Sequence, residues 1–335
     1  MSASDAVQRK LQEAAVNVER YMEKLLESRR PETLYEAGRH IIAAGGKRLR
    51  PYLVLKSCEL VGGDPELAIP YAAALEVLHN FTLIHDDIMD NDFLRRGVPT
   101  VHEKWGVPMA ILGGDLLFVK VYQSMVEPAM KGAVPIDRAL ACVNRVTKAT
   151  VTLCEGQALD ITYSGNEDIS KEDYISMVEG KTSALFRACA EVGAIIGGGD
   201  PDDIELLGSF AWDSGVAFQI VDDILGVVSD EETLGKPVGS DIREGKKTLI
   251  MIHALEKATP AEKGGLLKVL GNEDASEHDI ALATQTLIET GSIEYAREKA
   301  DEYVDRAMDT ISYFPDSEAK GDLIELTEYF TKRTY

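Results

Sequence analysis

The chain has 335 residues, of which 35 are Lys or Arg and 57 are Asp or Glu, so its formal net charge is −22. This acidic balance argues against a nucleic-acid-binding protein and against a protein held on anionic lipid by charge, because both need a basic surface. A hydrophobic fraction of 45% and a charged fraction of 27% are typical of a globular chain with a sizeable core.

Helical periodicity runs through almost the whole chain. Val7, Leu11, Ala14 and Val18 recur at steps of three and four, and Asp64-Pro65-Glu66 is typical of a helix start. Further helices are predicted over 71–92, 107–127, 137–163, 171–196, 203–229, 247–258, 275–290, 292–313 and 316–333. No segment alternates as a convincing strand, and no linker or repeat interrupts the pattern. The sequence therefore predicts a single all-α domain over residues 1–335.

The cellular setting is indicated by the cysteines and by the N-terminus. Four cysteines lie far apart without a CxxC pair, which favours a reduced cytosolic chain over a zinc site or a disulfide framework. The N-terminal segment has no apolar signal region, and no continuous run approaches the roughly 18–20 apolar residues of a membrane span. We expect a cytoplasmic protein without an integral membrane segment.

A first acidic motif, LIHDDIMDND, ends one of the apolar helices. Asp86 and Asp90 are four residues apart, so on a helix they share one face at about 6 Å. Two carboxylates so placed repel each other unless a cation bridges them, and oxygen ligands favour a hard ion such as Mg²⁺. A solvated acidic helix end is the alternative for a motif of this kind alone.

A second acidic motif, FQIVDDILG, places Asp222 and Asp223 among apolar neighbours. Charged pairs in such surroundings are costly unless they are compensated. Two acidic helix ends in one helical chain suggest helices that share metal ions across a cavity, and two unrelated solvated ends are the alternative.

Cationic segments accompany both acidic motifs. They are GGKRLRP at 45–51, Arg95-Arg96-Gly97, Lys181-Thr182, Gly235-Lys236 and REGKK at 243–247. The two glycines of the first segment would allow the backbone to approach a ligand. Cations gathered beside a metal site in an acidic chain indicate a bound phosphate. A Glu-x-x-His pair, Glu76 to His79, raises the alternative of a di-iron protein, but the six histidines provide no second pair of this kind.

Together and in this order, these motifs resemble the trans (E-type) short-chain isoprenyl diphosphate synthases, and among them the archaeal geranylgeranyl type. The resemblance covers most of the chain, through GGKRLRP (45–51), HNFTLIHDDIMDNDFLRRG (79–97), GQALD (156–160), KT (181–182), FQIVDDILG (218–226) and GKPVGSDIREGKKT (235–248). It implies an isoprenoid synthase-type helical bundle around a central cavity. It also implies a homodimer and a Mg²⁺-dependent transferase that condenses an allylic diphosphate with isopentenyl diphosphate.

The resemblance also implies roles for individual residues. The Mg²⁺ ions, three per site with substrate bound, would be held by Asp86, Asp90 and Asp222, with Asp87, Asp160 and Asp223 acting indirectly. Gly226 stands where many family members have a third Asp. Isopentenyl diphosphate would be bound by Lys47, Arg50, His79 and Arg96. Allylic diphosphate would be bound by Arg95, Lys181, Thr182, Gln219, Lys236 and Lys246, of which Lys181, Thr182 and Gln219 lie near the reacting carbon.

Product length is expected to be set by the helix that precedes Asp86. Phe81 lies five residues earlier, roughly 7.5 Å down the helix axis. In the family, an aromatic at this place followed by a small residue, here Thr82, resembles the C20 type; Leu78 lies a turn further down. A C15 or mixed C15/C20 product, a class I terpene cyclase and a non-catalytic synthase subunit are the alternatives. Core packing is the alternative role for Phe81, as it is for His79.

Overall fold

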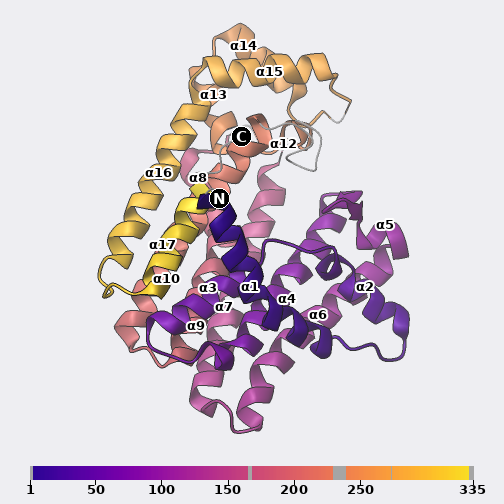
Figure 1. The fold of residues 1–335 in the computed structure, drawn as a ribbon. Helices are drawn as coiled ribbons and strands as arrows, with labels where there is room; N and C mark the ends of the chain where they lie inside the picture. The colour runs from indigo at the N-terminus through magenta and orange to yellow at the C-terminus, as the bar shows by residue number, and fades with distance from the viewer. Residues whose placement is uncertain (1–2, 165–167, 229–238, 273, 332–335) are drawn as a thin grey trace. The chain divides into compact units, whose positions relative to one another are not determined.

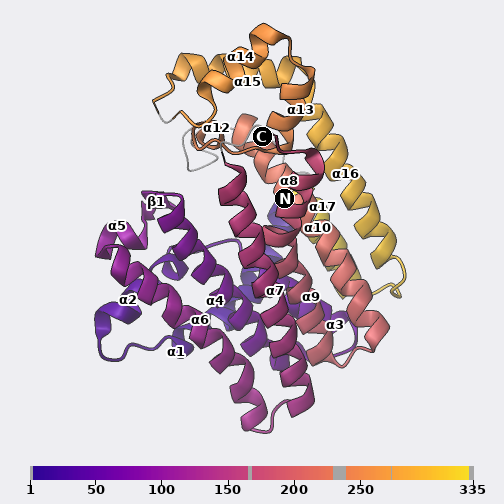
Figure 2. The same cartoon turned by 180° about the vertical axis from the view of Figure 1, so that it is seen from behind.

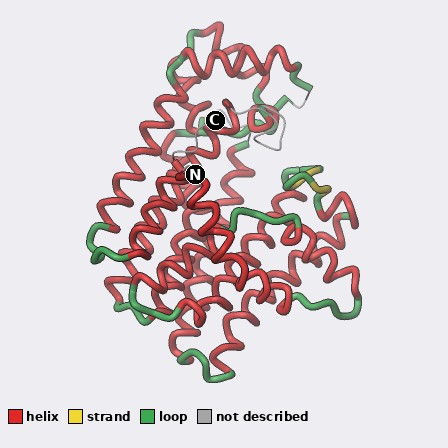
Figure 3. Tube along the Cα trace, in the orientation of Figure 1, coloured by secondary structure: helices red, strands yellow, loops and turns green. Residues whose placement is uncertain are grey.

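The computed structural model describes residues 3–164, 168–228, 239–272 and 274–331. Most of them are helical, and the only strands among these residues are a two-residue antiparallel pair, so the predicted all-α class is confirmed (Figure 3). In chain order the elements are α1 (Ala3–Leu25), α2 (Glu32–Ala43), α3 (Leu49–Leu60), α4 (Pro65–Met89), β1 (Leu94–Arg95), β2 (Val98–Pro99), α5 (Val101–Trp105), α6 (Val107–Met130), α7 (Ile136–Tyr163), α8 (Lys171–Val178), η1 (Glu179–Ser183), α9 (Ala184–Gly197), α10 (Pro201–Val228), α12 (Ser240–Arg243), α13 (Leu249–Lys257), α14 (Pro260–Val269), α15 (Glu277–Glu289), α16 (Ser292–Ile311) and α17 (Glu318–Thr331).

Contacts between Cα atoms divide the chain into two compact units. Unit 1 comprises residues 1–148, 186–208 and 311–326, and unit 2 comprises 149–185, 209–310 and 327–335. Their boundaries fall inside α7, α9, α10, α16 and α17. The single domain over residues 1–335 stays a prediction.

Unit 1 is built around α4. This helix packs on α1, α3 and α6, and α2 packs on α6 (Figure 1). Its start follows from the sequence, because the Asp64 side chain accepts a hydrogen bond from the Glu66 backbone N–H and Pro65 takes the first helical position. Residues 71–78 are all buried, so α4 is the core helix of the unit and its acidic C-terminal end is anchored firmly.

Unit 2 has its own apolar core. It is formed by side chains of α8, α10, α13, α14, α15 and α16, including Tyr174, Ile220 and Ile224. Helices α14 and α15 lie side by side beyond α13 (Figures 1 and 2). Helix α14 was not among the predicted helices, because its Gly264-Gly265 pair and its exposed polar residues interrupt the apolar periodicity.

Three differences from the predicted elements are small but informative. The segment predicted as one helix over 171–196 contains the π-helical turn η1. The hairpin β1–β2 follows the first acidic motif, where no strand was expected. Two helices, α4 and α6, are long and apolar enough by length and composition to cross a membrane, although 61% of the best window of α4 is buried inside the protein. Isolated polar residues interrupt both helices, so neither contains a continuous apolar run of the length expected for a membrane span.

Candidate functional site

The first acidic motif forms the C-terminal end of α4. Asp90 is the residue that ends the helix, and its N–H donates to the Asp86 carbonyl at 2.8 Å. Asp86 and Asp90 are partly buried, whereas Asp87 is fully buried. One helix face therefore presents the Asp86–Asp90 pair, as the spacing predicted, and Asp87 points into the protein.

Arg95 compensates the other two carboxylates of this motif. Its Nε donates to Asp87 Oδ1 at 2.7 Å, and its Nη2 donates to Asp92 Oδ2 at 2.8 Å. The chain turns back to allow this through Asn91, which has a positive φ of 54°, and through the β1–β2 hairpin. The predicted allylic-diphosphate residue thus lies against the acidic motif, charged and held in place.

His79 lies in a strongly positive part of unit 1. Burial and the charges of Arg50, Arg96, Arg95 and Arg48 hold the pKa of its imidazole well below the usual range, so the ring is neutral at pH 7. Among the described residues, the ring makes no hydrogen bond or ion pair. A satisfied core histidine would have a partner; the ligand-binding role of His79 stays a prediction.

Arg50 and Lys47 extend this positive region. The Arg50 guanidinium lies 5.0 Å from the centre of the Phe186 ring, and its buried Nε has no hydrogen-bond partner among the described residues. Lys47 is exposed on the loop before α3. A buried, unsatisfied arginine donor is costly unless a ligand uses it.

The Gly45–Gly46 pair has a role that the sequence did not indicate. We expected these glycines to let the backbone approach a ligand. In the structure a Cβ at Gly46 would lie 3.0 Å from the Arg96 guanidinium, and the φ of Gly46 is +147°. Arg96 donates to the carbonyl oxygen atoms of Ile41, at 3.0 Å, and Gly45. The glycines therefore make room for Arg96.

In unit 2, Lys181 and Thr182 lie in the π-helical turn η1. The turn packs closely on the backbone of α7 at Gly156. A Cβ added at Gly156 would lie 2.2 Å from the backbone nitrogen of Lys181, so only glycine fits there. Lys181 Nζ donates to Asp160 Oδ2, which is four residues further along α7. Single π-turns of this kind are frequent at functional sites.

The second acidic motif in unit 2 is held by neutral partners. Thr182 Oγ1 donates to Gln219 Oε1 at 2.8 Å, and Gln219 Nε2 donates to Asp223 Oδ1 at 2.9 Å. Tyr174 Oη donates to Asp223 Oδ2 at 2.7 Å. Burial and the nearby Asp241 carboxylate raise the pKa of Asp223 to about 7. Tyr174 was not among the predicted residues, because it lies 49 residues from Asp223 and no local pattern pairs the two.

The remaining predicted residues of unit 2 surround the end of α10. Asp222 is exposed beside Asp223, and Lys246 is paired with Glu244 at 2.6 Å. A Cβ at Gly226 would lie 2.9 Å from Asp241 Oδ2, so a carboxylate from α12 covers the place of the missing third Asp. Lys236 lies outside the described residues.

The chain-length residues of α4 meet aromatic side chains of α6. The Phe81 ring is 5.1 Å from that of Phe118, which in turn is 5.4 Å from that of Tyr122. Leu78 is fully buried, and the Thr82 hydroxyl donates to the His79 carbonyl at 2.8 Å. Phe118 and Tyr122 were missed, although their spacing of four residues on an apolar helix is a signal for a shared face.

The donor chemistry of the acidic motifs suits a hard cation. Asp86 and Asp90 provide carboxylate oxygen atoms on one helix face, which is the ligand type that Mg²⁺ prefers. In the described part of the chain, no three His, Cys, Asp or Glu side chains converge as a ready metal cluster. Asp86 and Asp90 belong to unit 1 and Asp222 belongs to unit 2.

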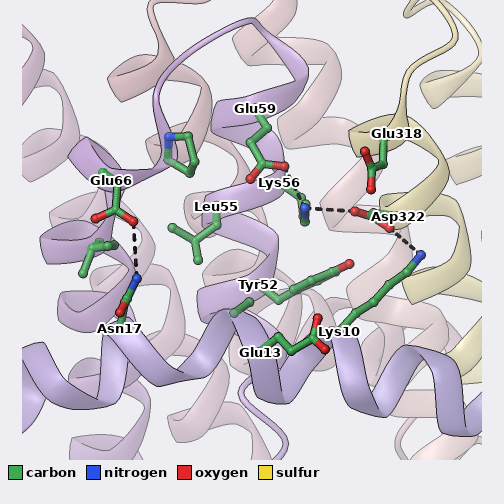
Figure 4. A pocket seen from close by; sticks show the side chains of 13 residues that line it. Lys10, Glu13, Asn17, Tyr52, Leu55, Lys56, Glu59, Glu66, Glu318 and Asp322 are labelled. Atoms are coloured by element: carbon green, nitrogen blue, oxygen red, sulfur yellow. Dashed lines mark hydrogen bonds and ion pairs between the residues drawn. The ribbon is translucent and has the colours of Figure 1, made fainter.

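A pocket of about 270 Å³ lies elsewhere in unit 1, among residues of α1, α3, α4 and α17 (Figure 4). Asp322, which is buried, is bound there by Lys10 at 2.7 Å and by Lys56 at 2.9 Å. None of the predicted site residues lines it. Both cations of the pocket are thus paired with Asp322, which indicates an ion-pair network that joins α1, α3 and α17.

Comparison with known proteins adds independent information. The family model described as polyprenyl synthetase matches residues 31–287. The chain is 46% identical over 284 residues to a geranylgeranyl diphosphate synthase of Saccharolobus solfataricus, with 85% of each chain covered. It is 44% identical to a geranylgeranyl diphosphate synthase of Sulfolobus acidocaldarius, with 90% of each covered. The crystal structure of a geranylgeranyl pyrophosphate synthetase from Pyrococcus horikoshii superposes with a TM-score of 0.92 at 43% identity, covering 98% of this chain and 99% of that one.

Proposed function

Because the chain belongs to the polyprenyl synthetase family, we propose that it condenses allylic diphosphates with isopentenyl diphosphate to give all-E geranylgeranyl diphosphate, a C20 product. Membership confirms the predicted isoprenoid synthase fold and the predicted class of prenyl-transferring enzyme. The observation that carries the proposal is the positive region of unit 1, where the buried Arg50 Nε and the neutral His79 ring have no partners among the described residues.

We assign the isopentenyl diphosphate to this region. Lys47, Arg50 and Arg96 would bind its phosphates, since guanidinium groups suit phosphate oxygen atoms in charge and shape. His79, kept neutral by its cationic neighbours, would donate a hydrogen bond without adding charge. The Phe186 ring, packed on Arg50, limits the movement of that guanidinium.

We assign the allylic diphosphate to the acidic ends of α4 and α10. Mg²⁺ held by Asp86, Asp90 and Asp222, with three ions per site, would supply positive charge to the leaving diphosphate. Arg95, Lys181, Lys246 and Lys236 would add fixed positive charge. Arg95 is already held by Asp87 and Asp92, and Lys181 by Asp160, so neither needs to reorganise when substrate binds.

The polar chain of unit 2 would orient groups near the reacting carbon. The Thr182 donation to Gln219, and the Gln219 donation to Asp223, fix the direction of the Gln219 amide. With this amide fixed, the Gln219 and Thr182 oxygen atoms would stabilise positive charge that develops on the allylic carbon. Fixed placement of the two substrates would contribute the rest.

Product length would be limited by Phe81. Its ring is supported from behind by Phe118 and Tyr122, so it cannot swing away easily as a chain elongates. The small Thr82 leaves space beside it, and the buried Leu78 closes the next turn. This arrangement supports a C20 limit in preference to a C15 limit.

A homodimer is supported by an exposed apolar stripe on α6 and at the start of α7. Leu112, Val119 and Val126 recur at steps of seven, and Met130 and Ile136 continue the stripe with exposed fractions of 81% and 69%. Such a surface on one face of a helix is typical of a protein interface. The four free cysteines support a reduced, cytoplasmic setting.

Incubation of the purified full chain with Mg²⁺, farnesyl diphosphate and labelled isopentenyl diphosphate, followed by chain-length analysis, tests the function. We expect labelled C20 diphosphate and no labelled product in EDTA. A cyclised hydrocarbon made from the allylic substrate alone would indicate a terpene cyclase instead. No incorporation would contradict the proposal.

A further inference from the structure

A buried polar bridge connects Arg96 to the middle of α4. Asn80, which is fully buried, accepts from Arg96 Nη1 through its Oδ1 at 3.4 Å. Its Nδ2 donates to the Glu76 carbonyl oxygen at 2.8 Å and lies 3.4 Å from Glu76 Oε1. Glu76 is only 2% exposed.

The same Glu76 carboxylate fixes the loop before α3. Arg48 Nη1 donates to Glu76 Oε1 at 2.8 Å, while its other nitrogen atoms donate to Glu19 and to the Ile42 carbonyl, both at 2.9 Å. Arg48 has a positive φ of 54° and is buried. Its donors are thus used inside the protein, whereas the buried Nε of Arg50 in the same motif has no hydrogen-bond partner among the described residues.

These contacts join two segments that carry predicted ligand cations. The loop that ends at Arg48 carries Lys47, and Arg96 follows the acidic motif. Both segments are tied to Glu76 and Asn80, which flank His79 on α4. Because a phosphate-binding site needs its cations at fixed positions, the bridge has a consequence for binding.

We propose that Glu76 and Asn80 are positioning residues for the isopentenyl diphosphate site: they hold Arg96 and the 45–48 loop in place without contacting the substrate. This inference rests on the proposed function. Arg96 is confined from the opposite side by Gly46, where an added Cβ would lie 3.0 Å from the guanidinium. The position of Arg96 is therefore fixed between Asn80 and the Gly46 backbone.

Asn80→Leu tests the bridge, because it keeps a similar volume and removes both hydrogen-bonding atoms. We expect the KM for isopentenyl diphosphate to rise roughly tenfold, as expected for one lost hydrogen bond to a charged group. The KM for farnesyl diphosphate should stay within about twofold, and kcat at saturating isopentenyl diphosphate should be largely retained. A rise of both KM values in parallel, or no change in either, would overturn the inference.

Gly46→Ala keeps the test decisive if Asn80→Leu does not fold, since Gly46 is exposed. Its Cβ would displace Arg96, so the same selective rise in KM is expected. Gly62→Ala is the matched control: Gly62 also has a positive φ, of +83°, but its Cβ would meet no atom within 4 Å. Equal effects of the two substitutions would attribute the change to backbone strain and contradict the inference. Absence of incorporation by the wild-type chain would instead contradict the proposed function.

Discussion

The two acidic motifs look alike in the sequence, but their buried carboxylates are compensated in opposite ways. In the first motif, Asp87 is bound by the charged Arg95. In the second, the hydrogen-bond partners of Asp223 among the described residues are the neutral Tyr174 and Gln219, and its pKa is raised to about 7. The buried carboxylate of the first motif is therefore charge-compensated as folded. The second carries charge that a bound cation would stabilise.

The largest expected effect concerns the first aspartate of each acidic motif. Asp86→Asn and Asp222→Asn should each lower incorporation of isopentenyl diphosphate by roughly a hundredfold to a thousandfold, since each removes a proposed Mg²⁺ ligand. Saturating steady-state assays over a range of Mg²⁺ concentrations measure this. Asp316→Asn, at a fully exposed aspartate, is the control. Full activity of either motif variant would show that its motif does not hold the metal.

Replacing the buried carboxylate of each motif should change the stability of the protein in opposite directions. Asp87→Asn should destabilise the metal-free protein by about 3 kcal/mol, because it breaks a buried ion pair and leaves the Arg95 charge with less compensation. Thermal unfolding followed by circular dichroism measures this. An unchanged unfolding temperature would mean that Arg95 is held by Asp92 alone.

Asp223→Asn should do the opposite. The pKa of Asp223 is raised from 3.8 to about 7 in the folded chain. Between these two pH values the folded chain binds a proton that the unfolded chain releases. The contribution of protonated Asp223 to the free energy of unfolding is therefore lost as the pH rises from about 4 to 7. An asparagine at this position does not titrate, so the Asp223→Asn variant does not lose this stability as the pH rises. The unfolding temperature of Asp223→Asn relative to wild type should therefore increase from pH 5 to pH 8 in metal-free protein, and a constant difference would contradict the assignment.

Only the helix of the first motif carries a proposed limit on product length. Phe81→Ala should lengthen the main product by one or two C5 units, because it opens the space in front of Phe118. Chain-length analysis of the products measures this. Leu67→Ala, at an exposed residue of the same helix, should leave the product unchanged. A persistent C20 limit in Phe81→Ala would return Phe81 to a packing role.

The smallest effect concerns one neutral partner of the second motif. Tyr174→Phe removes the donor to Asp223 and should cost roughly 1 kcal/mol of stability at pH 8, less than the loss in Asp87→Asn. Chemical denaturation at fixed pH measures both. A larger loss in Tyr174→Phe than in Asp87→Asn would reverse the comparison of the two motifs.

The helical class and the acidic helix ends could be predicted because they depend on local patterns. Spacing alone places Asp86 and Asp90 on one face, and Asp64-Pro65 marks the start of α4. The partners of Asp223 could not be predicted, because Tyr174 is 49 residues away in sequence and nothing local pairs them. The Gly46 contact with Arg96 is also non-local, so the glycines were assigned to a ligand and not to a side chain.

The extra residue in the η1 turn has a consequence for how the chain tolerates changes of length. In a regular α-helix, Tyr174 and Thr182 would differ in direction by roughly 80°, because eight steps of about 100° exceed two full turns by that amount. The wide turn absorbs one step, which brings both side chains to the face that bonds Asp223 and Gln219. A one-residue deletion within 179–181 would leave an uninterrupted helix with the two side chains seven positions apart, roughly 20° from perfect alignment, so both bonds could still form. We therefore expect this helix to tolerate the loss of one residue without losing either bond.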